Sequence, residues 1–400
     1  MASAFLSKFG VPHLIIDKSV FPRDKVCGDA LSGKVFSILK KLDEDYGKPM
    51  INSTDGFIGC EGIMFAAPNG KSIDIPFKIN RTAHNEIPAG FVSQRMVFDH
   101  FLHRYLNRNF ADFREGHELR QIVRSNGKLV IEIQDQNTNY KVETKLLIAC
   151  DGERSVATTL LGGHHKELNH YSAGIRAYYK NVEGMHADNF IELHFIKEFL
   201  PGYLWIFPLP NGLANVGAGM LSSHVSKNNV NLRERMLNAI QYHPVLSKRF
   251  KNAELQGKIM GWGLPLGSKR RKLSGDHFIL TGDAGSLIDP FTGEGISNAM
   301  FSGMAAAETA FKALQTDDFS ANGLQSYDQR VYNRLSSELQ ISRRLQQLCK
   351  YPFLFNLVVN KASKNRAFRE TISCMFDDLD LRSKLKNPMF YVKLAFGDKS

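Results

Sequence analysis

The stretch ILTGDAGSLIDPFTGEGISNAMFSGMAAAE, residues 279–308, decides the fold of this chain. Its first residues form an apolar run typical of a buried strand, and the Gly282-Asp283 pair that follows predicts a tight turn. In an α/β sheet, a residue directly after a strand faces the crevice at the carboxyl ends of the strands, where ligands bind. The residues from Gly295 to about Gln315 predict a helix. We therefore predict a strand–turn–helix unit that binds a ligand.

Two glycines and the start of the helix indicate which ligand this unit suits. Gly293 and Gly295 lack side chains, so their backbone amides can approach a ligand closely. The first turn of the helix offers unpaired N–H groups and the positive end of the helix dipole. A flavin becomes anionic at N1 and O2 when it is reduced, and its ribityl hydroxyls can donate to Asp283. The unit therefore favours a flavin cofactor.

Composition limits the class of protein. The chain has 400 residues, of which 43% are hydrophobic and 23% charged, as expected for a globular protein large enough for two domains. No apolar run reaches the roughly 18 residues that a membrane-spanning helix needs. The five cysteines are scattered without a C-x-x-C pair, which argues against structural zinc and favours a reducing, cytoplasmic compartment.

The formal net charge of +11 favours an anionic partner. Nucleic acid, an anionic membrane surface and a phosphorylated substrate all fit this charge. The sequence contains no motif for nucleic-acid binding, so we expect no nucleic-acid partner. We interpret the basic run at 269–272 as a solvated turn, with contact to an anionic lipid headgroup as the alternative.

Hydrophobic periodicity predicts the elements around this unit. Apolar runs at 14–17, 145–149 and 277–281 predict strands that share one parallel sheet. Alternating residues over 171–222 predict antiparallel strands of a second sheet. The other expected elements are helices over 30–46, 93–107 and 231–251, a hairpin over 56–79 with its turn at 68–70, three strands within 118–150 with a turn at 126–127, and a mostly helical chain after 325.

Three motifs resemble those of a known superfamily. The segment around Gly282-Asp283 resembles the Gly-Asp motif of FAD-dependent oxidoreductases with the hydroxylase-type, glutathione-reductase-like fold. VSQRMVFDHFL, residues 92–102, resembles their R-x-x-F-D-x-x-L helix, which implies that Arg95 contacts the cofactor and that Asp99 caps or pairs locally. ACDGERSVATT, residues 149–159, resembles their D-G-x-x-S-x-V-R motif, although Ala157 and Thr158 stand where that motif has Val-Arg.

Two further segments resemble the geranylgeranyl reductase family in particular. FPRDKVCGDALSG, residues 21–33, resembles its Lys-x-Cys-Gly segment, and PGYLWIFPLPNGLANVGAG, residues 201–219, resembles its Tyr-x-Trp-x-Phe-Pro strand pair. The resemblance runs from residue 2 to about 325. It implies an enzyme that saturates C=C bonds of a polyprenyl lipid or isoprenoid side chain with reduced FAD, which NAD(P)H or another reductant would supply with electrons.

The resemblance also implies roles for individual residues. Cys27 would lie near the isoalloxazine ring, as the candidate catalytic residue, although a lone cysteine is also a common buried hydrophobe. An isoprenoid substrate would lie in an apolar channel lined by Tyr203, Trp205, Phe207 and Pro208. The expected cofactor-binding residues are Asp17, Arg23, Lys25, Cys27, Gly28, Arg95, Asp151, Gly152, Gly282, Asp283, Pro290, Gly293 and Gly295.

The first residues of the chain match the second half of a dinucleotide-binding βαβ unit. The small residues of 2–8 predict a helix, and Asp17 closes the next strand at the position of the acid that binds ribose in such units. A complete G-x-G-x-x-G loop would have to precede Met1, since the chain contains none. We therefore expect an FAD domain truncated at its N-terminus, and a chain that binds FAD poorly on its own.

These elements predict an α/β protein with a discontinuous Rossmann-like FAD domain made of residues 1–55, 90–165 and 266–325. The antiparallel strands predict an inserted substrate domain made of 56–89 and 166–265, and residues 326–400 a helical C-terminal region. The alternatives to a polyprenyl reductase are a flavin monooxygenase that hydroxylates an aromatic compound, a flavin halogenase and a non-catalytic truncated homologue. A peripheral contact with a membrane surface would suit an isoprenoid substrate.

Overall fold

The computed structural model describes residues 1–45, 47–52, 56–77, 88–136, 138–353, 356 and 359–360. The chain forms two compact units, and each is discontinuous in sequence. Unit 1 comprises residues 1–25, 95–171 and 264–339, and unit 2 comprises residues 26–94, 172–263 and 340–400. Among the described residues, no helix combines the length and the apolar composition needed to cross a membrane.

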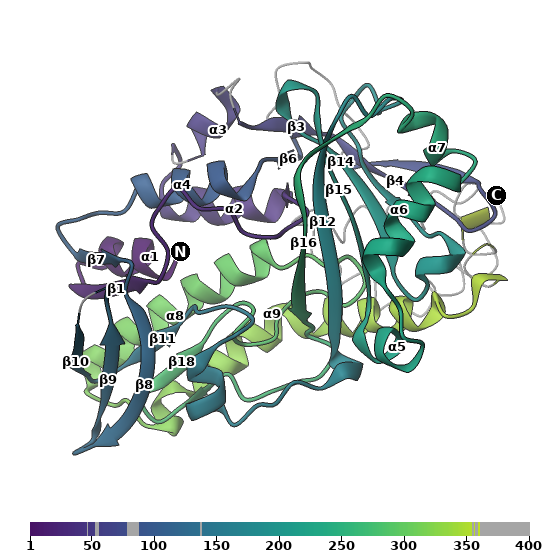
Figure 1. The fold of residues 1–400 in the computed structure, drawn as a ribbon. Coiled ribbons are helices and arrows are strands. Elements are labelled where there is room, and N and C mark those ends of the chain that lie inside the picture. The colour runs from purple at the N-terminus through teal and green to yellow at the C-terminus, as the bar shows by residue number, and fades with distance from the viewer. Residues whose placement is uncertain are drawn as a thin grey trace, which may run out of the picture. The chain divides into compact units, whose positions relative to one another are not determined.

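Unit 1 combines short strands with long helices (Figure 1). Its elements are α1 (Ala2–Lys8), β1 (His13–Asp17), α4 (Arg95–Arg104), β7 (Ala111–Glu115), β8 (Glu118–Ser125), β9 (Lys128–Gln134), β10 (Asn139–Thr144), β11 (Leu147–Ala149), β17 (Ser274–Gly275), β18 (Phe278–Leu280), α8 (Ile296–Thr316) and most of α9 (Ala321–Leu348). The predicted helix after Gly295 is confirmed as α8.

The expectation of one shared parallel sheet is wrong for β1. In the described structure β1 pairs in parallel with β7, while β11 pairs in parallel with β18 in a separate ladder. Side chains of all three predicted strands nevertheless enter one apolar cluster, in which Leu14 and Ile16 pack with Leu147, Phe278 and Leu280. An apolar run marks a strand as buried, but it does not specify which strand is its hydrogen-bonded neighbour.

Residues 118–150 contain four strands instead of the predicted three. The turn at Asn126-Gly127 is confirmed and joins β8 to β9, with both residues at positive φ. The additional strand is β10, which pairs antiparallel with β9. Its residues alternate between exposed and half-buried, because it lies on the edge of a small sheet and carries no continuous apolar run.

Helix α1 packs directly on α8. A Cβ atom at Gly303 of α8 would lie 3.1 Å from the backbone nitrogen of Ala2 and 3.3 Å from the Cβ of Met1. The helices approach this closely because glycine leaves room for the backbone of its neighbour. The small residues of the two helices therefore set their spacing.

Unit 2 is built around a seven-stranded sheet. Its elements are β2 (Ala30–Leu31), α2 (Gly33–Leu42), α3 (Lys48–Asn52), β3 (Ile58–Cys60), β4 (Gly62–Ala66), β5 (Ser72–Pro76), β6 (Gly90–Val92), most of β12 (Tyr171–Lys180), β13 (Ile191–His194), β14 (Tyr203–Pro208), β15 (Leu213–Leu221), α5 (Ser222–Lys227), α6 (Leu232–Tyr242), α7 (Leu246–Arg249) and most of β16 (Glu254–Pro265).

The large sheet has the order β16-β12-β15-β14-β13-β4-β5. The predicted antiparallel pairing within 171–222 is confirmed for β12 to β15, and so is the hairpin of β4 and β5. One contact differs, because β13 pairs in parallel with β4. The segment predicted as helical over 231–251 forms two helices, α6 and α7.

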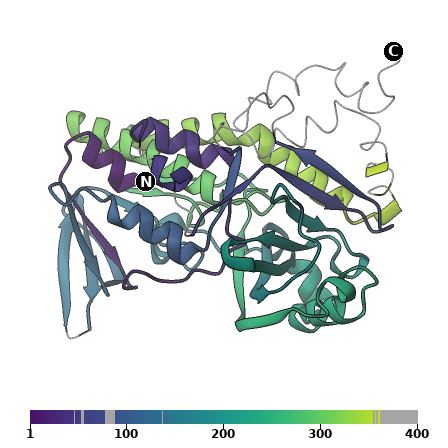
Figure 2. The ribbon, with the colours of Figure 1, turned by 90° about the horizontal axis from the view of Figure 1, so that it is seen from above.

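The two faces of this sheet differ. On the face that we call the helix face, Leu204, Ile206, Val216 and Ala218 form an aliphatic core with residues of α6 and α7. Figures 1 and 2 show these helices beside the sheet. The opposite face, which we call the aromatic face, carries the remaining side chains of β14, because successive residues of a strand point to opposite sides.

The structural units do not follow the predicted domain boundaries throughout. Residues 26–55 lie in unit 2, whereas the sequence-based division places them in the FAD domain. The division into a cofactor domain and a substrate domain stays a prediction, because compactness does not assign a role. In the C-terminal region α9 is helical, and residues 361–400 lie outside the described residues.

Candidate functional site

In unit 1, the Gly-Asp turn follows β18 and packs against α8. Gly282 has a φ of +53°, and a Cβ atom there would lie 2.8 Å from the Cβ of Ala299. Its backbone N–H donates to the hydroxyl of Ser302, at 3.0 Å. Both the backbone conformation and the close packing therefore require glycine, and they fix the position of Asp283.

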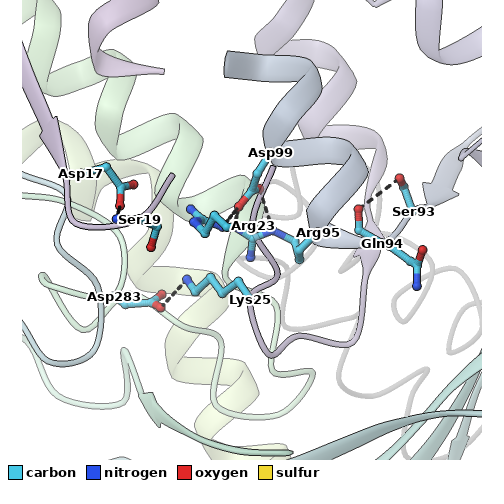
Figure 3. Close-up of polar contacts among 9 residues, drawn as sticks. All are labelled: Asp17, Ser19, Arg23, Lys25, Ser93, Gln94, Arg95, Asp99 and Asp283. Atoms are coloured by element: carbon cyan, nitrogen blue, oxygen red, sulfur yellow. Dashed lines mark hydrogen bonds and ion pairs between the residues drawn. The ribbon is translucent and has the colours of Figure 1, made fainter. Parts of the chain in front are cut away.

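Asp283 lies beside both the Lys25 ammonium and the N-terminus of α8. The Lys25 ammonium lies 3.3 Å from the Asp283 carboxylate, towards which it points in Figure 3. A Cβ atom at Gly295 would lie 3.6 Å from Asp283 Oδ1, which places the start of α8 beside the same carboxylate. Within the described part of the chain, no side-chain hydrogen bond caps the N-terminus of α8, so its first N–H groups can serve a ligand. This arrangement fits the ribityl hydroxyls and the anionic edge of a reduced flavin.

The loop between Asp283 and α8 is shaped by Asp289, which sequence reasoning missed. Its Oδ1 accepts hydrogen bonds from the backbone N–H groups of Phe291 and Thr292 and from the Thr292 hydroxyl. Gly293, at φ +73°, donates its backbone N–H to the Asp289 carbonyl. An aspartate before a proline is a turn signal that could have identified this residue. The loop that carries Pro290 is therefore preformed.

Arg95 and Arg23 meet at one buried carboxylate (Figure 3). Arg95 donates to both oxygens of Asp99, at 2.7 and 2.8 Å, and Arg23 donates to Oδ2 at 2.5 Å. Burial raises the pKa of Asp99, but the two guanidinium groups outweigh it and hold that pKa below its usual range. The expected local pairing of Asp99 is confirmed. Salt bridges fix both arginines, and their contact with a cofactor stays a prediction.

Asp17 ends β1, as expected. Its Oδ1 accepts a hydrogen bond from the backbone N–H of Ser19, at 2.9 Å, which forms a turn directly after the strand. Figure 3 shows this contact. The role of Asp17 in holding a ribose stays a prediction.

Asp151 caps the turn that follows β11. Its Oδ2 accepts hydrogen bonds from the backbone N–H groups of Val156 and Ala157, at 2.9 and 3.3 Å. Gly152 has a φ of +78°, and no atom of the described residues would lie within 4 Å of a Cβ atom there. Thr158, which stands where the resembled motif has arginine, donates its hydroxyl to the Ala284 carbonyl, at 2.8 Å. This hydrogen bond ties the Asp-Gly turn to the Gly-Asp turn of the same unit.

In unit 2, the Cys-Gly segment packs on the aromatic face. A Cβ atom at Gly28 would lie 2.9 Å from Cε2 of Phe207 and 3.7 Å from Nε1 of Trp205. Glycine is therefore needed at this position for the Phe207 ring to lie where it does. Two segments that are far apart in the sequence, residues 21–33 and 201–219, thus meet at Gly28, and both resemble the geranylgeranyl reductase family.

The aromatic face carries a continuous series of rings, which we call the aromatic row. It consists of Phe65, Phe195, Tyr203, Trp205 and Phe207, and successive ring centroids lie 6.0, 5.5, 6.2 and 6.3 Å apart. The three phenylalanines are buried, whereas Tyr203 and Trp205 are half-buried. The row therefore offers a partly accessible apolar wall, and Pro208 ends β14, the strand that carries Tyr203, Trp205 and Phe207.

A small-residue strand lies beside this wall. In the register of β14 and β15, Tyr203 pairs with Gly219 and Trp205 pairs with Gly217. A Cβ atom at Gly217 would lie 2.1 Å from Cζ2 of Trp205, so the indole ring occupies the space that a side chain would fill. The rings of the predicted channel share one face, as expected, and their contact with a substrate stays a prediction.

Polar residues that sequence reasoning missed hold the Cys-Gly segment in place. The Asn215 side chain donates to the Cys27 carbonyl and to Asp29, and it accepts a hydrogen bond from the Trp205 indole, each at 2.8 Å. The Tyr178 hydroxyl donates to Asp29 at 2.9 Å. Asn215 lies within the segment that resembles the family strand pair, but nothing in its spacing indicates a contact with Cys27.

The basic run at 269–272 is tied to unit 1 by its own contacts. Lys269 and Arg271 pair with Glu167, at 2.9 and 3.0 Å, and Arg270 lies over the Tyr332 ring, 4.6 Å from its centroid. The run lies outside the helices and strands, and Lys269, Arg270 and Lys272 are exposed, as the solvated-turn interpretation predicts, but the Arg271 side chain is only 7% exposed and is not solvated. Contact with a lipid headgroup stays an alternative that these contacts do not test.

Comparison with known proteins shows the family of this chain. The family model described as "FAD binding domain" matches residues 1–337. A protein named digeranylgeranylglycerophospholipid reductase from Methanococcus vannielii is 30% identical over 362 residues, which cover 87% of this chain and 84% of that protein.

Solved structures share the fold. A geranylgeranyl bacteriochlorophyll reductase-like protein from Thermoplasma acidophilum matches with a TM-score of 0.80 and 23% identity, covering 96% of this chain and 95% of that chain. A flavin-dependent brominase matches with a TM-score of 0.73 and 20% identity, covering 98% of this chain and 94% of that chain. At these identities the two matches establish the architecture alone, and with the family model they confirm the expected α/β fold with a Rossmann-like FAD domain.

Proposed function

This chain belongs to the FAD-binding domain family and, within it, to the geranylgeranyl reductases, and on that premise we propose that it saturates C=C bonds in the polyprenyl chain of an isoprenoid lipid. The relative from Methanococcus vannielii is named for a digeranylgeranyl glycerophospholipid. A lipid of that class, or a related isoprenoid side chain, is the substrate that we infer here.

The observation that carries this proposal is the aromatic row beside the Cys-Gly segment. An isoprenoid chain has no hydrogen-bonding groups, so it is held by apolar and aromatic contacts. The half-buried rings of Tyr203 and Trp205 can provide such contacts, and Gly28 lets the Cys-Gly segment approach them. We infer that the alkene is held beside Cys27 by Tyr203, Trp205 and Phe207, whose rings lie on the aromatic face, whereas Pro208 pairs with Ala214 of the helix-face core at the end of β14.

We propose that residues of unit 1 hold FAD. Asp283 would accept hydrogen bonds from the ribityl hydroxyls, and the first N–H groups of α8 would face the flavin edge that becomes negative on reduction. Lys25 would offset negative charge beside Asp283. The remaining proposed contacts within unit 1 are those of Asp17, Arg23, Arg95, Asp151, Gly152, Gly282, Pro290, Gly293 and Gly295.

The reaction adds two hydrogens across a double bond, one as a hydride and one as a proton that a nearby acid or a water molecule must supply. Reduced FAD, when bound, supplies the hydride. The residues of this chain hold the alkene against one wall, exclude water with aromatic rings and keep the reacting carbons in a fixed position. NAD(P)H or another reductant would restore the electrons.

We also propose that the protein is cytoplasmic and contacts a membrane surface. Its net charge of +11 suits an anionic bilayer that contains the lipid substrate.

The proposed reaction is tested with the protein reconstituted with FAD, reduced with dithionite and incubated with geranylgeranyl lipids in vesicles. We expect mass spectrometry to show the gain of two hydrogens per reduced double bond. Trp205→Ala should lower this gain, whereas Leu246→Ala on the helix face should leave it in place. No mass gain with several polyprenyl classes would overturn the proposal. Stimulation of NAD(P)H oxidation by a small aromatic compound would instead favour a monooxygenase.

A further inference from the structure

We propose that Asn215 is a positioning residue that fixes the Cys27 segment and the Trp205 indole relative to each other. The inference deepens the proposed function and rests on it, because Cys27 and Trp205 belong to the site proposed for the alkene. None of the sequence motifs assigns a role to this side chain.

Asn215 uses both ends of its amide. Its Oδ1 accepts a hydrogen bond from Trp205 Nε1, while its Nδ2 donates to the Cys27 carbonyl and to Asp29 Oδ2. An indole N–H only donates, and a carbonyl and a carboxylate only accept, so these partners determine the orientation of the amide. One side chain thus joins three segments of unit 2.

Burial makes the loss of any of these hydrogen bonds costly. Asn215 and Asp29 are both 0% exposed, so water cannot replace a lost partner. Asp29 also has a φ of +70°, a backbone conformation that non-glycine residues rarely adopt. The hydrogen bonds from Asn215 and Tyr178 to its carboxylate hold this strained residue two positions after Cys27.

The contact between Gly28 and Phe207 also links the Cys27 segment to the aromatic row. A Cβ atom at Gly28 would nearly touch Phe207, and Phe207 pairs with Asn215 in the register of the sheet. A shift of the Asn215 amide would break its hydrogen bond to the Cys27 carbonyl and the hydrogen bond that it accepts from the Trp205 indole. The Asn215 amide therefore acts together with the packing of Gly28 on Phe207 and the Tyr178 hydrogen bond to keep the Cys27 segment at a fixed distance from the aromatic row.

Two substitutions separate the three contacts. Aspartate at position 215 would still accept from Trp205, but it would lose both donors and bring a second carboxylate beside Asp29. Leucine would keep the approximate volume and lose every hydrogen bond. The pair of variants Asn215→Asp and Asn215→Leu therefore distinguishes the contact with Trp205 from the contacts with Cys27 and Asp29.

The experiment has two structural readouts that do not depend on catalysis. The chain has two tryptophans, so Trp262→Phe leaves Trp205 as the single indole for fluorescence. Peptide mass spectrometry follows the alkylation of Cys27 separately from the other cysteines. Leu246→Ala is the matched control, since it opens a cavity in the helix-face core of the same sheet without touching the aromatic face.

We expect Asn215→Leu to speed the alkylation of Cys27 and to shift the emission of Trp205. Asn215→Asp should speed the alkylation while changing the emission less. Leu246→Ala should lower the melting temperature without either change. With substrate, Asn215→Leu should lower kcat by about 100-fold, because misplacement of reacting groups costs rate more than binding. KM should change much less than kcat.

The positioning role is overturned if Asn215→Leu leaves the Cys27 alkylation rate and the Trp205 emission equal to those of the parent, or if Leu246→Ala changes both in the same way. An active parent with an unchanged kcat in Asn215→Leu would overturn it as well. Failure of the parent to reduce any polyprenyl lipid, with both structural readouts still responding to Asn215→Leu, contradicts the proposed function and supports the structural part of this inference.

Discussion

The two faces of the seven-stranded sheet hold buried polar groups by different means. On the helix face, Glu192 is 2% exposed and forms an ion pair with Arg249, with N–O distances of 2.5 and 2.8 Å. On the aromatic face, Asn215 is fully buried and bonds to an indole, a carbonyl and a carboxylate. An ion pair with Arg249 stabilises the buried Glu192 carboxylate, whereas three hydrogen bonds to uncharged and charged partners stabilise the buried Asn215 amide.

These two kinds of contact indicate different roles for the two faces. Arg249 of α7 donates to both oxygens of Glu192, so this bidentate ion pair ties the helix to the sheet with charge as well as direction. A triply bonded amide fixes angles as well as distances, because hydrogen bonds weaken steeply when they bend. The helix face therefore secures the fold of unit 2, and the aromatic face sets the geometry of the proposed site. Four sets of variants test this difference between the faces, and they are given in order of decreasing expected effect.

The largest effect should come from Arg249→Met. It leaves the Glu192 carboxylate buried without its cation, which costs about 3–5 kcal/mol in the free energy of unfolding. Asn215→Leu is the matched change on the aromatic face and should cost about 1–3 kcal/mol, because it leaves buried donors and acceptors unpaired. Urea denaturation measures both. A greater loss for Asn215→Leu than for Arg249→Met would reverse the contrast.

Gly28→Ala should come next, with a cost of about 1–3 kcal/mol from overpacking. The added Cβ would lie 2.9 Å from Cε2 of Phe207, so the ring must move. Phe207→Leu in the same chain removes that contact and should recover most of the loss in melting temperature. If the second substitution recovers nothing, the contact between Gly28 and Phe207 is not the cause.

The pH dependence of stability should also differ between the faces. Burial raises the pKa of Glu192, but hydrogen bonds from His194 and Arg249 hold it below its usual value of 4.5. Because the folded-state pKa is lowered, the stabilisation is complete above the unfolded-state value and is lost as the pH falls towards the folded-state value. Each unit by which the pKa is lowered is worth about 1.4 kcal/mol.

Denaturation at a series of acidic pH values should therefore show a shallower loss of stability for Glu192→Gln than for the parent. Leu246→Ala, which removes neither a titratable group nor a hydrogen-bond partner of one, should keep the slope of the parent. A parent-like slope for Glu192→Gln would mean that other carboxylates carry the acid sensitivity.

The smallest expected effect is that of Tyr178→Phe, which removes one hydrogen bond to Asp29 and should cost about 1 kcal/mol. Tyr179→Phe is the matched control on the opposite face, where the ring packs edge-on against Phe250. Thermal unfolding should show a smaller change for Tyr179→Phe. Equal changes would place the hydroxyl of Tyr178 outside the network that supports Asp29.

Sequence patterns predicted local elements better than their neighbours in space. The small residues after Gly295 predicted α8, and the alternation of β12 to β15 predicted an antiparallel sheet, because each signal is contained in one stretch of chain. The pairing of β1 with β7 was not predicted, because side-chain burial does not encode the order of strands.

The candidate site shows the same limit. Motifs identified the Gly-Asp turn, the Cys-Gly segment and the ring-bearing strand, since each has a characteristic spacing. Asn215, Asp29 and Tyr178 form a network whose members come from three separate strands or turns. No local pattern marks such a network, because its hydrogen bonds form only when the sheet has assembled.

Gly217 and Gly219, which lie opposite the aromatic row, differ in the space that they leave for a side chain. At Gly217 a methyl group would lie 2.1 Å from the Trp205 ring and 2.3 Å from a backbone carbonyl oxygen, whereas at Gly219 its first neighbour would be Trp205 Cζ3, 3.7 Å away. Position 219 can therefore accept a small side chain, which would reduce the space beside the Trp205 ring. Position 217 has no room for one. One residue can thus change the space beside the rings without rebuilding the sheet, which makes position 219 the place to alter the proposed substrate channel.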